Sequence, residues 1–341
     1  MIKLRLAIDA MGGDHGPSIV IAALKKAVSQ FPDVEFAVVG RQQELQQLLQ
    51  SQALNDHPAI SIVHAEDVVT MADKPGYALR AKPESSMRKA LELLADGHAQ
   101  GVVSGGNTGA LMTKAYFVLK TLPGVLRPAL MTALPNQRGG QSYLLDLGAN
   151  PVCDSDTLFQ FGVMGSVAAQ QTLAISKPRV ALLNMGEEEI KGSDVVRHAA
   201  QLLQSSEAVD YIGFIEGNDM FTGKADVIVC DGFVGNIALK SCEGLAELLV
   251  ANVKSTIASH WAYRWFFRLF SKKLQQSWDW LKPDHYNGAS LIGLRGVVIK
   301  SHGSANSEAF YSAIQQAVTE AREELPEQIK SRVESVLLEQ A

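Results

Sequence analysis

Residues 101–109 read Gly-Val-Val-Ser-Gly-Gly-Asn-Thr-Gly, a short β-branched run that ends in paired glycines. This order predicts a buried strand, a tight turn and the start of a helix. Paired glycines let successive backbone N–H groups point to one side, and a helix start adds the positive end of its dipole. The stretch therefore predicts an anion-binding turn, although an ordinary helix cap would use the same residue types.

The same order of strand, small-residue loop and helix recurs along the chain. Strand-like runs occupy residues 4–8, 34–39, 60–63, 101–103, 143–145, 180–183, 211–215, 227–229 and 297–299. Helical patterns lie between most of them, for example at 19–30, 44–51, 86–95, 195–204 and 239–253. This alternation predicts an α/β fold with a mainly parallel sheet and helices on both faces.

Seven of the strand-like runs lead into loops of Gly, Asn, Asp and Ser. Ligands of open α/β sheets bind beyond the carboxyl ends of the strands, so we expect these loops to converge on one crevice. The same residue types also make ordinary turns. No linker rich in Pro or Ser divides the chain, and we expect residues 1–341 to form a single α/β unit.

Composition excludes several classes of protein. With 47% hydrophobic and 20% charged residues, the 341-residue chain has the composition of an ordinary globular protein. Its formal net charge of -5 argues against a general nucleic-acid binder. The three cysteines show neither CxxC pairing nor metal-ligand spacing, so we expect reduced core thiols and no metal site.

Targeting signals are equally sparse. The chain reaches Asp9 before an apolar signal-peptide region can form, and the uncharged stretch 157–176 contains three glutamines. A buried helix explains that stretch better than a membrane span, which needs about 20 mostly apolar residues. We therefore expect a cytoplasmic protein whose membrane contact is peripheral.

Two further loops carry side chains suited to an anion. His302, next to Gly303 and Ser304, follows one strand and precedes a helical pattern at 308–321, while Lys191 follows an acidic run beyond another strand. The alternatives are a structural histidine and a solvated charged turn. Neither a GxSxG hydrolase elbow nor an HExxH zinc motif occurs, so the sequence gives no support to a covalent or metal mechanism.

Residues 255–287 differ from the rest of the chain and predict a helical hairpin. All four tryptophans lie there, and Arg264, Arg268 and Lys272 form a basic line at helical spacing. Trp and Phe on a basic helix are typical of an element lying in a membrane interface. A dimer interface is also rich in aromatic residues and Arg, so both interpretations remain open.

The motifs together resemble those of the bacterial acyl-acyl-carrier-protein:phosphate acyltransferase family. The similarity covers essentially the whole chain in one order and is carried by residues 7–14, 104–110, 146–150, 231–236 and 299–304. The resemblance implies a fold related to isocitrate and isopropylmalate dehydrogenases and to phosphate acetyltransferases. It also implies a homodimer, no cofactor and peripheral membrane association. Asn287 and the pair Leu294-Arg295 depart from the family's pattern, as does the Trp-rich hairpin.

The activity that the resemblance implies is transfer of a fatty acyl group from acyl carrier protein to inorganic phosphate. The product, an acyl-phosphate, would serve glycerophospholipid synthesis through a membrane glycerol-3-phosphate acyltransferase. Phosphate is already nucleophilic and a thiolate leaves readily, so the site needs anion binding, alignment and oxyanion stabilisation rather than a strong base.

These needs assign roles to the candidate residues. The predicted phosphate-binding residues are Gly105, Gly106, Asn107, Thr108, His302 and Ser304. Among the predicted catalytic residues, Lys191 stabilises negative charge, Asp231 positions it, and Asn236 donates to the oxyanion. The predicted membrane or carrier contacts are Trp261, Arg264, Trp265, Arg268 and Lys272.

Three other functions compete with this one. A coenzyme A-dependent acetyltransferase would not need the aromatic, basic hairpin. A nicotinamide-dependent dehydrogenase of the same fold is disfavoured because the glycines follow GGxxG rather than GxGxxG, although relatives of this fold can bind NAD without that motif. A non-catalytic membrane scaffold would need the hairpin but not the polar strand-end loops.

Overall fold

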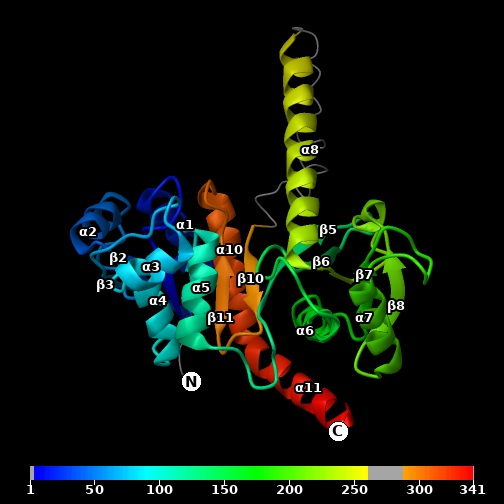
Figure 1. The fold of residues 1–341 in the computed structure, drawn as a ribbon. Helices are drawn as coiled ribbons and strands as arrows, with labels where there is room; N and C mark the ends of the chain where they lie inside the picture. Colours follow the sequence, from blue (N-terminus) through cyan, green and yellow to red (C-terminus); the bar gives the residue numbers. More distant parts are fainter. Residues whose placement is uncertain (1–3, 260–286, 341) are drawn as a thin grey trace.

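The computed structural model describes residues 4–259 and 287–340. These residues form one 11-stranded sheet in the order β3-β2-β1-β4-β11-β10-β5-β6-β9-β7-β8 (Figure 1). Its strands are β1 Leu4–Asp9, β2 Val34–Gly40, β3 Ile60–His64, β4 Gly101–Ser104, β5 Ala129–Pro135, β6 Gln141–Leu145, β7 Arg179–Leu183, β8 Asp210–Ile215, β9 Val227–Val229, β10 Ala289–Ile292 and β11 Val297–Lys300. All nine predicted strands are present, and the mainly parallel α/β fold is confirmed.

The sheet consists of two parallel halves that run in opposite directions. One half contains β3, β2, β1, β4 and β11, and the other contains β6, β9, β7 and β8. Between them, β10 and β5 add three antiparallel pairings: β11 with β10, β10 with β5, and β5 with β6. An odd number of antiparallel pairings reverses the direction of the second half within the ladder.

Helices cover both faces of the first half. Leu6 and Ile8 of β1 face α1 (Pro17–Gln30), α2 (Gln42–Ser51) and α10 (Ser307–Arg322), while Ala7 faces α4 (Ser86–Ala95) and α5 (Thr108–Leu119). Successive side chains of a strand point to opposite faces, which explains why these strands are largely apolar. A seven-residue helix, α3 (Pro75–Ala81), precedes α4.

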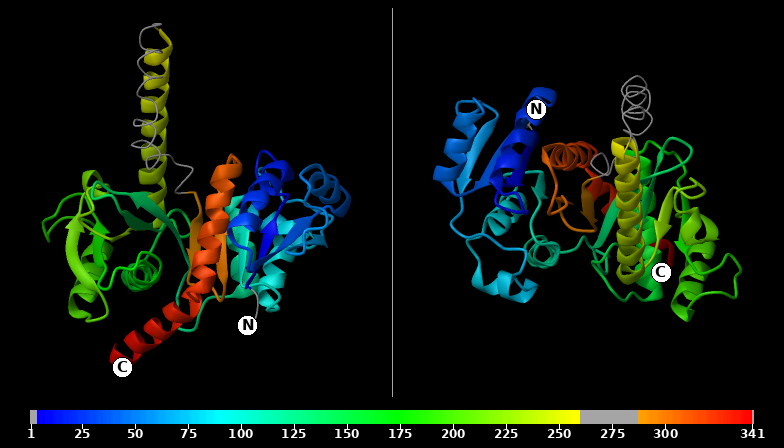
Figure 2. Two further views of the ribbon diagram at one scale, coloured as in Figure 1. Left: turned by 180° about the vertical axis from the view of Figure 1, so that it is seen from behind. Right: turned by 90° about the horizontal axis from the view of Figure 1, so that it is seen from above.

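The second half packs around a buried central helix. α6 (Ser155–Thr172) is apolar on most sides and lies against α7 (Asp194–Ser205) and α11 (Leu325–Gln340). This confirms the buried helix expected for the uncharged stretch. No helix of the described residues is long and apolar enough to cross a membrane. α10 packs on the first half and α11 on the second, so the C-terminal helices join the two (Figure 2).

α8 (Gly232–Ser259) rises from the junction of the two halves and projects well beyond the body (Figure 1). Seen from above, it lies between α10 and the second half (Figure 2, right). Leu245, Leu248 and Leu249 are exposed on it. The predicted helix covered residues 239–253, so the structure extends it at both ends. Of the predicted hairpin, residues 260–286 lie outside the described residues, including Trp261, Arg264, Trp265, Arg268 and Lys272.

Candidate active site

The loops that follow β1, β4 and β11 meet at one edge of the sheet. Asp14 N–H donates to the Gly303 carbonyl at 2.8 Å, and Ser301 N–H donates to the Ser104 carbonyl at 2.9 Å. Gly12 lies so close to the β4 loop that a Cβ there would be 2.5 Å from the Gly106 nitrogen. The predicted anion-binding turn and the predicted His302 loop are therefore neighbours. We call this group of three loops the glycine cluster.

A buried carboxylate organises the glycine cluster. Asp9, 1% exposed, accepts a 2.6 Å hydrogen bond from the Ser104 hydroxyl, and that hydroxyl accepts one from Gly106 N–H at 3.1 Å. Burial raises the pKa of Asp9, and hydrogen bonds from Ser104 and Ser86 act against that rise. The Gly106 N–H is thus already occupied. Gly106 instead allows the loop after β1 to approach the loop after β4 closely, at Gly12.

Asn107 performs a structural task with both ends of its amide. Its Oδ1 accepts from Ala110 N–H at 3.0 Å and caps α5, as Asn commonly does. Its Nδ2 donates to the carbonyls of Met71, at 2.9 Å, and Asp73, at 3.1 Å. The segment before α3 is thereby held over the start of α5. Thr108, the first residue of that helix, is half-buried beside it.

His302 and Ser304 bind each other. His302 Nδ1 lies 2.9 Å from Ser304 Oγ, and His302 N–H donates to Asn287 Oδ1 at 2.9 Å. Burial, followed by the positive charge of Lys240 on α8, lowers the pKa of His302 from its ordinary value. The imidazole is therefore kept neutral more readily than a free histidine, with the other ring nitrogen, Nε2, directed away from Ser304.

A second cluster forms where the loops after β6 and β9 meet. Gly232 N–H donates to the Asn150 carbonyl at 2.8 Å. Asp231 Oδ1 accepts from Val234 N–H at 2.8 Å and so caps the first turn of α8. Asn236 is exposed on the next turn, and a Cβ on Gly148 would lie 3.8 Å from its Cβ. The predicted catalytic residues Asp231 and Asn236 thus occupy the start of one helix.

Asp146 supports this second cluster as Asp9 supports the first. The side chain is fully buried and accepts hydrogen bonds from the N–H groups of Leu130, at 2.9 Å, and Asn150, at 2.6 Å. Burial raises its pKa, and these hydrogen bonds oppose the rise. In both halves, a carboxylate at the end of a strand fixes the loop that follows.

Lys191 lies on the loop after β7, the strand that neighbours β9 in the sheet. Its carbonyl accepts from Asn184 Nδ2 at 3.2 Å, and its side chain is exposed. Within the described residues, no hydrogen bond or ion pair joins the Lys191 side chain to Asp231 or Asn236. The structure places these predicted residues on neighbouring strand ends without direct contact.

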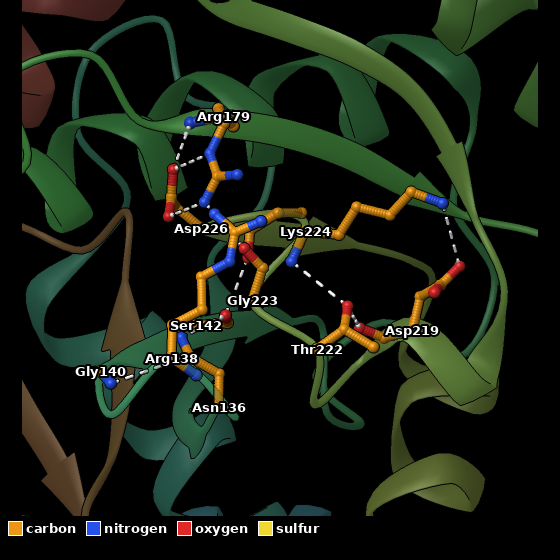
Figure 3. A network of polar contacts seen from close by, with 11 residues as sticks. Asn136, Arg138, Gly140, Ser142, Arg179, Asp219, Thr222, Gly223, Lys224 and Asp226 are labelled. Atoms are coloured by element: carbon orange, nitrogen blue, oxygen red, sulfur yellow. Dashed lines mark hydrogen bonds and ion pairs between the residues drawn. The ribbon is translucent and has the colours of Figure 1, made fainter.

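A polar network near the Lys191 loop includes Lys224, Asp219, Arg179 and Asp226 (Figure 3). Glu187 pairs with Lys224, which also lies 3.4 Å from Asp219. Beside them, Arg179 forms a two-pronged ion pair with Asp226, with distances of 2.8 and 2.9 Å. The acidic run before Lys191 is thus partly structural, as the solvated-turn interpretation did not foresee.

Five of the seven loops expected at one crevice form two groups. Contacts among the described residues join the loops of β1, β4 and β11 to one another, and those of β6 and β9 to one another. The loops after β7 and β8 join each other instead: Asn184 N–H donates to the Ile215 carbonyl at 2.9 Å, and Lys224 contacts both Glu187 and Asp219. α8 links the groups: Asp231 and Asn236 at its start belong to the second cluster, while Lys240 further along acts electrostatically on His302 of the glycine cluster.

Apolar side chains are exposed around the second cluster. Met185 and Ile190, on the Lys191 loop, are 75% and 81% exposed. Phe233 and Ile237, on the first turns of α8, are also exposed. A polar strand-end site with apolar side chains on both flanking segments suits a ligand with a polar head and an apolar chain.

The cysteines near the second cluster are poorly suited to catalysis. Cys153 and Cys230 are buried, and burial raises the pKa of Cys153 to about 12 and that of Cys230 well above its ordinary value. Both thiols are therefore poor nucleophiles at neutral pH. Within the described residues, no group of three or more His, Cys, Asp or Glu side chains could hold a metal ion.

The sequence interpretation assigned no role to Asp9, Ser104, Asp146 or Lys300, although it quoted all four within motifs. The usable signal was their position. Each is at or next to the last residue of a strand, and all four precede a glycine-containing loop. Polar residues at such positions contact either the ligand or the loop that binds it.

Comparison with known proteins shows how widely this arrangement is shared. A family model described as "Fatty acid synthesis protein" matches residues 4–328. A phosphate acyltransferase of Idiomarina loihiensis is 68% identical over 340 residues, covering 100% of both chains. One from Shewanella baltica strain OS155 is 52% identical over 339 residues, covering 99% of both.

Solved structures give the same fold. A phosphotransacetylase from Streptococcus pyogenes matches with a TM-score of 0.65 at 18% identity, covering 94% of each chain. A 4-hydroxythreonine-4-phosphate dehydrogenase from Klebsiella pneumoniae matches with a TM-score of 0.54 at 16% identity, covering 94% of this chain and 98% of the other. At these identities the likeness concerns the fold alone. The full-length identity to the phosphate acyltransferases, together with the family model, shows the family. The chain belongs to the phosphate acyltransferase family of fatty acid synthesis.

Proposed function

We propose that the protein transfers a fatty acyl group from acyl carrier protein to inorganic phosphate, giving an acyl-phosphate for glycerophospholipid synthesis. The observation that carries this proposal is the pair of polar strand-end clusters linked by α8, one of them bordered by exposed apolar side chains. Such a reaction needs donors for the phosphate and donors for the thioester carbonyl, and one cluster for each meets that need.

Direct attack by phosphate fits the surroundings of the available nucleophiles. Ser104 is fully buried and its hydroxyl is committed to Asp9 and Gly106, while the Cys230 thiol is buried with a raised pKa. Neither is suited to forming an acyl-enzyme. In the proposed step a phosphate oxygen adds to the thioester carbonyl, and the C–S bond breaks from the tetrahedral intermediate to release the carrier thiolate.

The roles of the site residues follow from their placement. We assign phosphate to the glycine cluster, with donors from Gly105, Thr108, His302 and Ser304, while Gly106 and Asn107 shape it. The oxyanion that develops on the carbonyl faces Lys191 and Asn236, and Asp231 positions Asn236 by capping α8.

The apolar side chains near the second cluster support a long acyl chain as the transferred group. Met185, Ile190 and Phe233 would cover methylene groups of the acyl chain. Each methylene group that is buried in this way stabilises binding by about 0.8 kcal/mol. A short acyl group on coenzyme A would leave these side chains in water. This contrast favours a long-chain acyl donor over acetyl-coenzyme A.

The partners that we propose beyond the donor are a second copy of the chain, an anionic membrane surface and a membrane glycerol-3-phosphate acyltransferase. The exposed leucines of α8 suit a homodimer contact. Residues 255–287 would supply the membrane or carrier contact, with Arg264, Arg268 and Lys272 contributing about 1 kcal/mol each near anionic lipid.

One assay separates this function from its rivals. The protein is incubated with long-chain acyl carrier protein and phosphate, and acyl-phosphate is detected directly by mass spectrometry. Product from the carrier and not from acetyl-coenzyme A supports the proposal. Product from acetyl-coenzyme A alone identifies the acetyltransferase, reduction of NAD by a hydroxy acid identifies the dehydrogenase, and membrane binding without turnover identifies the scaffold.

A parallel experiment tests the hairpin. Charge reversal of Arg264, Arg268 and Lys272 should abolish sedimentation with anionic vesicles while activity on soluble acyl carrier protein is retained. Loss of activity with unchanged vesicle binding would identify carrier docking instead. A dimer that falls to a monomer, with both other properties intact, would identify an interface segment.

A further inference from the structure

Lys300 is a buried lysine at the floor of the glycine cluster. It is the last residue of β11, and only 7% of it is exposed. Its Nζ lies 3.4 Å from the Gly105 carbonyl and also contacts the Ser301 carbonyl. The side chain therefore ends where the loops after β4 and β11 meet.

Among the described residues, no carboxylate forms an ion pair with Lys300. An ammonium group carries three N–H donors, and the described residues supply two carbonyl acceptors and no ion pair. Asp9 and Asp14 attract it from a greater distance, and Asp9 is engaged by Ser104 and by backbone N–H groups. Burying an ammonium without a counter-charge is costly, which makes this arrangement unusual for a purely structural lysine.

We propose that the Lys300 ammonium is a direct ligand of the phosphate, reaching it from beneath the glycine loops and receiving from it the missing negative charge. This inference rests on the proposed function and adds a residue to its phosphate site. Phosphate offers strong acceptor oxygens and up to two negative charges, whereas the loop N–H groups carry only partial positive charge. A full positive charge at the floor of the cluster would bind the anion and hold it as it attacks.

Titration behaviour is consistent with this geometry. Burial is the main cause that lowers the pKa of Lys300 to about 8, and the positive charge of Lys240 adds to it, against the attraction of Asp9 and Asp14. A bound phosphate anion would favour the charged form, so phosphate binding and protonation of Lys300 would be coupled.

Lys114 provides a matched control. It is also buried, at 0% exposure, and burial likewise lowers its pKa to about 8. Its Nζ donates to the Lys82 carbonyl at 2.8 Å, beneath the segment around α3 and away from the β11 loop. Replacing each lysine by methionine removes one buried charge from the same protein, and only one of the two lies in the glycine cluster.

The test is calorimetric titration of the purified enzyme with inorganic phosphate. Lys300→Met should weaken phosphate binding roughly tenfold or more, the scale of losing one charge-assisted hydrogen bond, while Lys114→Met leaves the affinity unchanged. The melting temperature of phosphate-free Lys300→Met should not fall, because an uncompensated buried charge has been removed. A Lys300→Met enzyme that binds phosphate as tightly as the wild type overturns the inference.

The wild-type protein supplies a second measurement that needs no variant. Its phosphate dissociation constant should rise about tenfold between pH 7 and pH 9, as Lys300 loses its proton. In Lys300→Met this rise should vanish, which assigns it to Lys300 rather than to Asp9, Asp14, His302, Lys240 or Glu243 nearby. A wild-type affinity that is constant over this range also overturns the inference.

The assay of acyl-phosphate formation distinguishes the two levels of failure. A wild-type enzyme that makes acyl-phosphate, with Lys300→Met unaffected in phosphate affinity and phosphate KM, refutes the role of Lys300 alone. A wild-type enzyme that neither binds phosphate nor forms the product refutes the proposed function together with this role.

Discussion

The Ser104 hydroxyl donates a 2.6 Å hydrogen bond to the Asp9 carboxylate and so ties the end of β4 to the end of β1. The same hydroxyl accepts from Gly106 N–H. A buried carboxylate thereby sets the shape of a loop that was predicted to bind an anion. Removing either partner should affect both folding and phosphate binding.

Ser104→Ala should destabilise the fold by about 1–3 kcal/mol, the cost of leaving a buried group short of a partner. The lost hydrogen bond acts to lower the Asp9 pKa, so that already raised pKa should rise further. The penalty should be largest above the folded-state pKa of Asp9 and should shrink as pH falls through it. Urea unfolding at several pH values measures this.

Ser142→Ala is the matched control for that experiment. Ser142 is equally buried, but its hydroxyl donates to the neutral Ala225 carbonyl. Its penalty should not depend on pH. Equal pH dependence in the two variants would remove the special role of Asp9.

Asn107→Asp should separate capping from loop anchoring. A carboxylate keeps the acceptor for Ala110 N–H but cannot donate to the carbonyls of Met71 and Asp73. We expect faster hydrogen exchange in residues 70–82 with little change in global stability. Asn107→Ala should add a loss of about 1 kcal/mol, because the cap is lost as well. Unchanged exchange in Asn107→Asp would mean that other contacts hold the segment.

Lys191→Met and Asp231→Asn should each lower kcat by roughly 10²-fold, the scale of losing one preorganised electrostatic group. Asparagine can still cap α8 through Val234 N–H, so Asp231→Asn tests charge rather than helix stability. Lys177→Met, at a lysine paired with Asp210, is the control and should keep full activity. Steady-state kinetics with acyl carrier protein as the donor measures this effect. Near-normal turnover of Lys191→Met would show that Lys191 is an ordinary surface charge.

Glu320→Gln should stabilise the protein at alkaline pH. Glu320 is buried on α10 and hydrogen-bonded to Ser290, and burial raises its pKa to about 7. The folded state holds this proton up to about pH 7 and the unfolded state only to about 4.5, so stability declines as pH rises between these values. Thermal unfolding at pH 8 should show a gain of up to roughly 3 kcal/mol for the variant, with little gain at pH 5. Equal gains at both values would point to packing instead.

Periodicity predicted most of the fold, and the missed elements have physical reasons. The strands of both parallel halves are continuous apolar runs, which is the signal that burial on two faces produces. β5 ends at Pro135, and β10 is four residues long and follows Gly288, so neither has a typical strand signal. Because these two strands reverse the sheet, missing them hid the fact that its two parallel halves run in opposite directions.

The candidate site was predicted at the level of loops more than of single residues. Glycines and strand ends located both clusters, because close backbone approach requires residues without side chains. Which N–H groups are free depends on partners far along the chain, such as Asp9 for Ser104 and Met71 for Asn107. A single sequence does not show such pairings.

The length of α8 has a mechanical consequence. At 28 residues the helix is about 42 Å long, while Asp231 and Asn236 lie at its base. A rigid rod held at one end acts as a lever: a tilt of about 5° sweeps its outer end through roughly 4 Å but shifts the first turn by only a fraction of an ångström. A partner bound at the outer end of α8 can therefore move by several ångströms while Asp231 and Asn236 at the base keep their positions.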